Sequence, residues 1–79
     1  MSRIRELQIK IQDEEETIRV IERQIRGYNI ALRQAIIEKD TVNIVHYRDR
    51  IETGEKALKI HKNSLKKNRE EYKRIQGQK

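Results

Sequence analysis

Two runs of residues, spaced alternately three and four apart, constrain the fold of this chain more than any other feature. Such spacing marks the a and d positions of a coiled coil, and we call these residues the seam. The first run is Ile4, Leu7, Ile11, Glu14, Ile18, Ile21, Ile25, Tyr28, Leu32 and Ala35, and the second is Ile44, Tyr47, Ile51, Gly54, Leu58, His61, Leu65, Asn68, Tyr72 and Ile75. Continuing the first run would place a seam position at His46, two residues beyond Ile44, where the second run begins. Because stutters and stammers insert four or three residues, this slip of two predicts a turn.

The two runs together predict an all-α antiparallel two-helix coiled-coil hairpin that forms one domain over residues 1–79. We expect helix 1 at about residues 3–38, a turn at about 39–41 and helix 2 at about 42–76, with Asp40 and Thr41 as candidate N-caps. The numbers of facing residues then sum to 79, which places Ile25 opposite Gly54. The alternatives are one continuous helix in a long parallel dimer and three helices with a break at Gly27, which the heptad crosses without interruption.

Four seam positions do not carry ordinary apolar core residues. Glycine costs about 1 kcal/mol relative to alanine inside a helix, so Gly54 either makes room for Tyr28 or marks a kink. Glu14 and Asn68 are polar, and such residues set register in some coiled coils. The alternative for Glu14 is that it snorkels out of a largely exposed seam. His61 is expected to be a half-buried seam residue and not a metal ligand.

The composition excludes several classes of protein. Of the 79 residues, 34% are hydrophobic and 41% are charged, and the chain has no Cys and no Pro. No segment approaches the roughly 20 apolar residues of a membrane span, and the N-terminus has no signal-peptide core, so we expect a cytoplasmic protein. Because no P-loop, GxGxxG, HExxH or CxxC motif occurs, we expect no enzyme, cofactor, metal or small-molecule substrate. The acidic run at residues 13–16 is expected to pair with Lys62, Lys66 and Lys67.

Several apolar residues lie beside or behind the seams, mostly near the turn. A lone hairpin would leave them in water, and exposed apolar clusters usually mark an interface. We therefore predict that they form a partner or dimer interface, either in a homodimeric four-helix bundle or as a docking patch for another protein. Both uses are compatible. The predicted interface residues are Val20, Ile30, Ile36, Ile37, Val42 and Val45.

The net charge of +6 lies in the C-terminal third of the chain, because residues 55–79 hold nine basic and three acidic groups. Five cations are expected on the outer face of the second helix, where they would bind nucleic acid through salt-sensitive contacts with phosphates. These residues are Lys59, Lys66, Lys67, Lys73 and Arg74. Against this function, no helix-turn-helix or other recognition motif occurs. Membrane binding is not expected, because the basic face lacks an apolar face that is free to insert.

The stretch "LRQAIIEKDTVNIVHYRDRI" (32–51) resembles the UVR motif, a short helical hairpin used for protein–protein contact in nucleotide-excision repair and in the regulation of Clp protease. The shared residues are Leu32, Ala35, Ile44, Val45, Arg48, Asp49 and Ile51. The chain departs from the motif at Thr41, where an aromatic residue is expected, and the resemblance covers about a quarter of the chain. The resemblance implies a contact with another protein.

Together these features predict a non-enzymatic protein–protein interaction module, a small adaptor or inhibitor that docks through the apolar residues near the turn. The basic helix would add charge steering. Two alternatives remain at this point: a basic nucleic-acid-binding protein that uses the Lys/Arg-rich C-terminal helix, and a structural assembly subunit.

Overall fold

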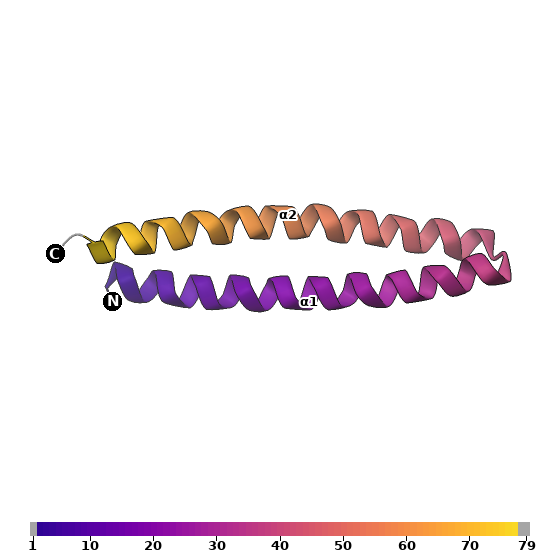
Figure 1. Ribbon diagram of the computed structural model, residues 1–79, viewed down its shortest axis with the longest axis horizontal. Helices are drawn as coiled ribbons and strands as arrows, with labels where there is room; N and C mark the ends of the chain where they lie inside the picture. The colour runs from indigo at the N-terminus through magenta and orange to yellow at the C-terminus, as the bar shows by residue number, and fades with distance from the viewer. Residues whose placement is uncertain (1, 78–79) are drawn as a thin grey trace.

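The computed structural model describes residues 2–77, which form two antiparallel helices, α1 (Arg3–Glu38) and α2 (Thr41–Gly77). The helices lie side by side along their whole length, with the chain termini at one end of the rod and the turn at the other (Figure 1). The rod measures 61 × 15 × 14 Å along its principal axes. The predicted all-α antiparallel hairpin is therefore confirmed, and neither the single continuous helix nor the break at Gly27 occurs.

The turn consists of Lys39 and Asp40, and its backbone ends one helix and starts the next. Lys39 adopts the left-handed conformation (φ 57°) and donates its N–H to the carbonyl of Ile36, while Asp40 donates to the carbonyl of Ala35. This pair of bonds is a Schellman motif, which satisfies the last carbonyls of α1. The Asp40 carboxylate then accepts a hydrogen bond from the backbone N–H of Asn43 (3.2 Å). Of the two candidate N-caps, Asp40 is therefore the one that caps α2.

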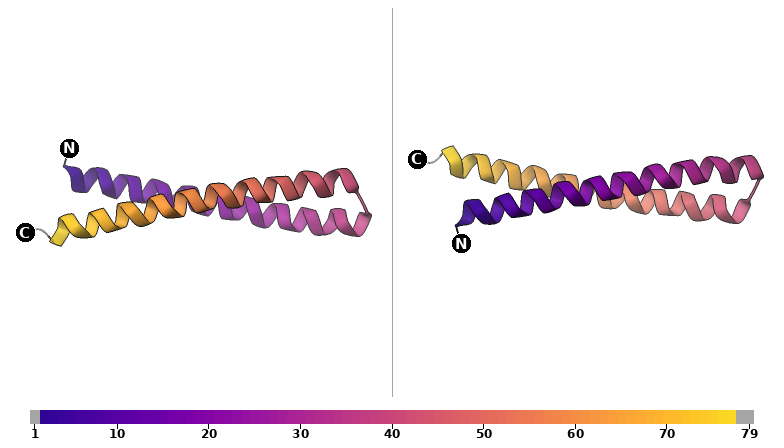
Figure 2. Two further views of the ribbon diagram at one scale, coloured as in Figure 1. Left: turned by 90° about the horizontal axis from the view of Figure 1, so that it is seen from above. Right: turned by 90° about the horizontal axis from the view of Figure 1, so that it is seen from below.

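The seam forms the contact between the helices. None of its twenty residues is exposed, and four of them, Leu7, Ile18, Ala35 and Leu65, are buried. With Ile4 and Ile44 at heptad position a, every other half-buried residue within the helices falls at position e or g, directly beside the seam. The two helices cross when the rod is seen from above or below (Figure 2), so their contact winds around the axis. The heptad read from the sequence therefore describes the packing.

Gly54 contacts the residue that the antiparallel pairing places opposite it. A methyl group added to Gly54 would lie 3.0 Å from Cγ1 and 3.3 Å from Cδ1 of Ile25. The helix α2 continues through this position without a break. Gly54 is thus a close-packed position. The side chain packed against it is that of Ile25, whereas the sequence had suggested that the glycine makes room for Tyr28.

The polar seam residue Glu14 has a specific partner across the helix pair. Its Oε1 lies 3.0 Å from Nδ1 of His61, and both side chains are partly buried. The expected pairing of residues 13–16 with Lys62, Lys66 and Lys67 is wrong, because Glu15 pairs with Arg69 (2.8 Å) and Lys62 pairs with Glu22 (3.7 Å). Side chains lean towards the N-terminus of their own helix, so Glu15 and Glu22 meet partners that are offset from their own level.

Candidate interaction surfaces

The surface of the rod divides into two flanks and a back. Positions e and b of both helices form one flank, positions g and c form the other, and position f lies on the back of each helix. Ion pairs between the helices confirm this division: Glu15–Arg69 joins two e positions, and Arg3–Glu71 joins two g positions. The hydrogen bond and the charge of Glu71 also raise the pKa of Arg3 above its ordinary value.

The two flanks differ strongly in charge. The e and b positions hold ten basic and four acidic residues, a net charge of +6, and we call this side the basic flank. Its basic residues are Arg5, Arg19, Arg26, Arg33, Arg48, Lys59, Lys62, Lys66, Arg69 and Lys73, and its acidic ones are Glu15, Glu22, Glu52 and Glu55. The g and c positions hold five basic and four acidic residues, a net charge of +1, and we call this side the neutral flank. The basic flank thus carries a charge equal to that of the whole chain.

Position b accounts for most of this charge. Seven of its ten residues are cations, and all seven are exposed: Arg5, Arg19, Arg26 and Arg33 on α1 and Lys59, Lys66 and Lys73 on α2. Within residues 2–77, none of these seven forms an ion pair with an acidic side chain. The basic flank therefore presents two rows of solvated cations, one on each helix.

The five cations predicted to contact nucleic acid do not share one face. Lys59, Lys66 and Lys73 lie on the basic flank, whereas Lys67 and Arg74 occupy c positions on the neutral flank. The sequence reasoning also missed the four arginines of the α1 row. Their spacing in multiples of seven residues was the signal, but counting charge by thirds of the chain concealed it, because acidic residues elsewhere on α1 cancel them.

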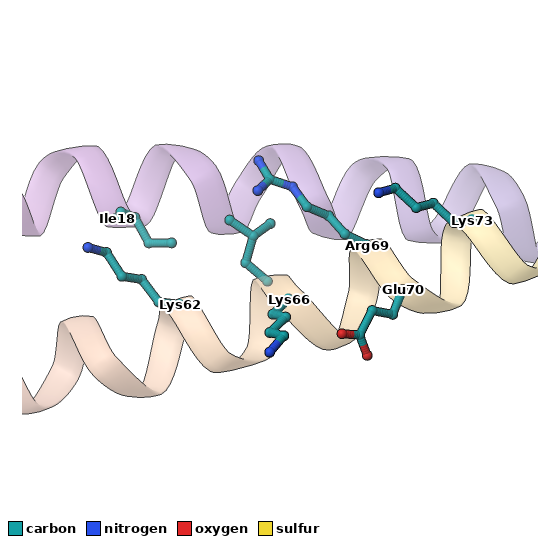
Figure 3. A pocket seen from close by; sticks show the side chains of 7 residues that line it. Ile18, Lys62, Lys66, Arg69, Glu70 and Lys73 are labelled. Atoms are coloured by element: carbon teal, nitrogen blue, oxygen red, sulfur yellow. The ribbon is translucent and has the colours of Figure 1, made fainter.

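A shallow groove of about 440 Å³ lies on the basic flank, in the half of the rod that carries the termini. Ile18 and Leu65 belong to its apolar floor, and its other lining residues are Lys62, Lys66, Arg69, Glu70 and Lys73. Lys62 and Arg69 extend from α2 towards α1, whereas Lys66 and Glu70 point away from α1 (Figure 3). The groove has a cationic rim with one carboxylate, and its open shape suits an extended anionic surface.

Four apolar residues gather around the turn, and we call them the turn cluster. Ile36, Ile37, Val42 and Val45 are between 49% and 79% exposed. All four belong to the predicted interface residues, and they lie within five residues of the turn on either side. The turn cluster therefore forms an exposed apolar end of the rod.

The other two predicted interface residues lie apart from the turn cluster. Ile30 is on the back of α1, seven residues before Ile37, and Val20 occupies a c position on the neutral flank. Val20 is level with Ile60, an exposed residue of α2 at the same heptad position that the sequence reasoning missed. Ile9, on the back of α1, was missed as well. The six predicted residues therefore belong to more than one surface.

The neutral flank carries a depression of about 190 Å³ beside Gly54. Its lining includes seam residues Ile21, Ile25 and Tyr28 together with the small residue Ala57. Thr17, Ala31, Ala57 and Ser64, at the g positions of this flank, are half-buried and small. Because these four side chains are short, they leave the apolar seam residues more accessible from this flank than long charged side chains would.

Residues 2–77 offer no cluster of three or more His, Cys, Asp or Glu side chains that could hold a metal ion. Within the same residues, neither helix has an apolar stretch long enough to cross a membrane.

In comparisons with known proteins, no family model, curated protein or solved structure matches the chain. The resemblance of residues 32–51 to the UVR motif therefore depends on the seven shared residues alone.

Proposed function

We propose that this chain is a non-enzymatic protein-interaction module, a small adaptor or inhibitor, that docks on another protein through the turn cluster. The observation that carries this proposal is the exposure of Ile36, Ile37, Val42 and Val45 at one end of the rod. Apolar groups gathered on an otherwise charged surface usually mark an interface, because leaving them in water has a free-energy cost. The resemblance of residues 32–51 to the UVR motif supports the same function.

The shape of the turn end supports docking into a groove of the partner. Two helix ends joined by a two-residue turn present a narrow tip, and apolar side chains from both helices surround it. Helical segments commonly place such side chains into apolar grooves. Arg33 and Arg48 belong to the basic flank near this end and would steer the tip towards a groove with an acidic rim.

Site-specific cross-linking with a matched pair of variants tests the docking proposal. A photo-reactive residue at position 45 should capture one protein from the source cell, and Ile37→Asp should abolish the capture. Ile9→Asp is the control, because Ile9 occupies the same heptad position on the same helix, 28 residues from Ile37. Equal capture by the Ile37→Asp variant and the wild type, or equal loss in both variants, would contradict the proposal.

We also propose that two hairpins pair into a four-helix bundle through their neutral flanks. The thin core supports self-association, since only four residues of the described chain are buried hydrophobic ones. The charges select the flank: two basic flanks of +6 each would repel one another, whereas two neutral flanks would bring together Val20, Ile60 and the depression beside Gly54.

Sedimentation equilibrium of two further variants tests the dimer. Ile60 and Ile30 are 67% and 69% exposed, but only Ile60 lies on the neutral flank. Ile60→Asp should therefore convert the dimer to a monomer at tens of micromolar, and Ile30→Asp should leave the dimer intact. A wild-type chain that is strictly monomeric would remove the dimer proposal, and large oligomers would favour a structural assembly subunit instead.

A further inference from the structure

We infer that the basic flank is a binding surface for the phosphate backbone of duplex nucleic acid, made by both helices. The sequence had pointed only to the C-terminal helix. In the fold, the arginine row of α1 and the lysine row of α2 border the same flank, and Lys62 and Arg69 lie between the rows. The part of this flank nearest the termini lies at the opposite end of the rod from the turn cluster, so the inference does not depend on the proposed docking function.

The surface is densest in the half of the rod that carries the termini. Seven cations of the basic flank lie there, and two of them are paired with Glu15 and Glu22. The seven are Arg5, Arg19, Lys59, Lys62, Lys66, Arg69 and Lys73. Along α2, the residues of the lysine row are separated by seven residues, which is about 10.5 Å at 1.5 Å per residue. Such regular, exposed cations match a partner whose negative charges also repeat along a line.

The chemistry of the flank favours a duplex over the other anionic partners. A membrane surface would require apolar side chains beside the cations, but the cationic half of this flank has none at its b positions. Single-stranded nucleic acid is bound through aromatic stacking, and all three tyrosines belong to the seam. Interfaces with proteins are enriched in aromatic residues, and the e and b positions of this flank hold none. A duplex requires only phosphate contacts, which the flank supplies.

Two double variants of α2 test the inference, because they change the net charge equally and differ only in flank. Lys66→Glu with Lys73→Glu removes two cations of the basic flank, and Lys67→Glu with Arg74→Glu removes the adjacent residues, which lie on the neutral flank. Binding to a labelled 20-base-pair DNA is measured by fluorescence anisotropy across a salt series. We expect the first pair to lower the affinity by at least 30-fold, and the second pair to lower it by less than fivefold.

The salt dependence of the wild-type chain gives an independent measure. Five to seven phosphate contacts predict a slope of log K against log salt concentration of about −4.5 to −6.3, which is a loss of about 10³-fold between 50 and 200 mM salt. The basic-flank pair should reduce this slope by about two. Circular dichroism establishes that each variant keeps its helices, so that a loss of affinity is not a loss of fold.

A third comparison tests the contribution of α1. Arg19→Gln lies in the arginine row, in the half of the rod that carries the termini, whereas Arg23→Gln lies four residues away on the back of α1. The first variant should weaken binding by about three- to tenfold, and the second should have no effect. An effect of Arg19→Gln no larger than that of Arg23→Gln would restrict the surface to α2 and overturn the two-helix inference.

The choice of anionic probe distinguishes a nucleic-acid duplex from an acidic polypeptide and from a membrane surface. Duplex DNA and duplex RNA should both bind, because each presents a phosphate backbone. Poly-glutamate of equal length and anionic vesicles should bind at least tenfold more weakly. Equal losses in the two α2 double variants, tighter binding to poly-glutamate, or an absence of duplex binding at 50 mM salt would each overturn the inference.

Discussion

The basic flank and the neutral flank are built on the same seam and from the same two helices, yet they present opposite surfaces. The first carries a net charge of +6 and the second a net charge of +1. One exposes long cationic side chains, and the other carries small half-buried residues together with the exposed Val20 and Ile60. In a two-helix rod, the seam decides which residues share a flank, so charge has to be counted by face.

The difference also separates the proposed roles of the two flanks. In the proposed dimer, repulsion between two basic flanks would keep this side out of the interface and accessible to an anionic partner. The neutral flank has the accessible seam residues and a net charge of only +1, so it is the side on which a second hairpin would pack. If both proposals hold, a dimer displays its two basic flanks on opposite sides.

The largest expected effect comes from a substitution that disrupts packing in the seam, because both flanks are built on this contact between the helices. Leu7 has no exposed surface, and we expect Leu7→Ala to lower the free energy of unfolding by about 2–4 kcal/mol. The nearby Ile9→Ala changes an exposed residue on the back of α1 and should cost less than about 0.5 kcal/mol. Urea titration followed by circular dichroism measures both. Equal losses would mean that the heptad does not describe the packing.

The next effect concerns the contact between Gly54 and Ile25, which lie beside the neutral flank. Gly27 has no neighbour within 4 Å of an added methyl group, so Gly27→Ala should raise the free energy of unfolding by about 1 kcal/mol through helix propensity. Gly54→Ala has the same propensity gain but brings the methyl to 3.0 Å from Ile25. Because the depression beside them gives Ile25 room to shift, we expect a smaller gain of about 0.5 kcal/mol.

Thermal unfolding of these two glycine variants ranks them directly. A gain for Gly54→Ala as large as that for Gly27→Ala would show that Ile25 yields without strain and that Gly54 is merely tolerated. The predicted order requires Gly27→Ala to be the more stable variant.

The smallest effect on stability comes from the ion pairs between the helices, but their loss should affect duplex binding differently on the two flanks. Glu15→Gln breaks the ion pair with Arg69 on the basic flank, and Glu71→Gln breaks the pair with Arg3 on the neutral flank. Each pair is exposed, so each loss should cost about 0.5 kcal/mol or less. Only Glu15→Gln raises the charge of the basic flank and releases a cation there, and it should strengthen duplex binding by about three- to tenfold. Equal binding by the two variants would contradict the assignment of the flanks.

The helices, the turn and the seam could be predicted because the alternation of three and four is a local signal that survives in a single sequence. Its slip of two residues located the turn, and the antiparallel pairing then placed Ile25 beside Gly54. The partners of the e positions could not be predicted in the same way. Glu15 reaches Arg69 and Glu22 reaches Lys62 because the side chains lean along their helices, which a count of levels ignores.

The candidate surfaces were predicted in part. The turn cluster follows from apolar residues that fall outside the seam, and the structure leaves all four of its members exposed. The two rows of the basic flank were visible in the sequence only after each residue had been given a heptad letter. Without that step, Lys66 and Lys67 looked equivalent, although the fold places them on opposite flanks.

The crossing of the two helices sets the size of the footprint that a straight partner can have. A two-stranded coiled coil with a pitch of about 150 Å turns by roughly 145° over a rod that is 61 Å long. A straight duplex laid on the cationic half therefore loses contact with the basic flank before it reaches the turn. About 30 Å of contact corresponds to about nine base pairs at 3.4 Å each. Lengthening a duplex beyond this footprint adds overlapping places to bind but no further contact for a single chain.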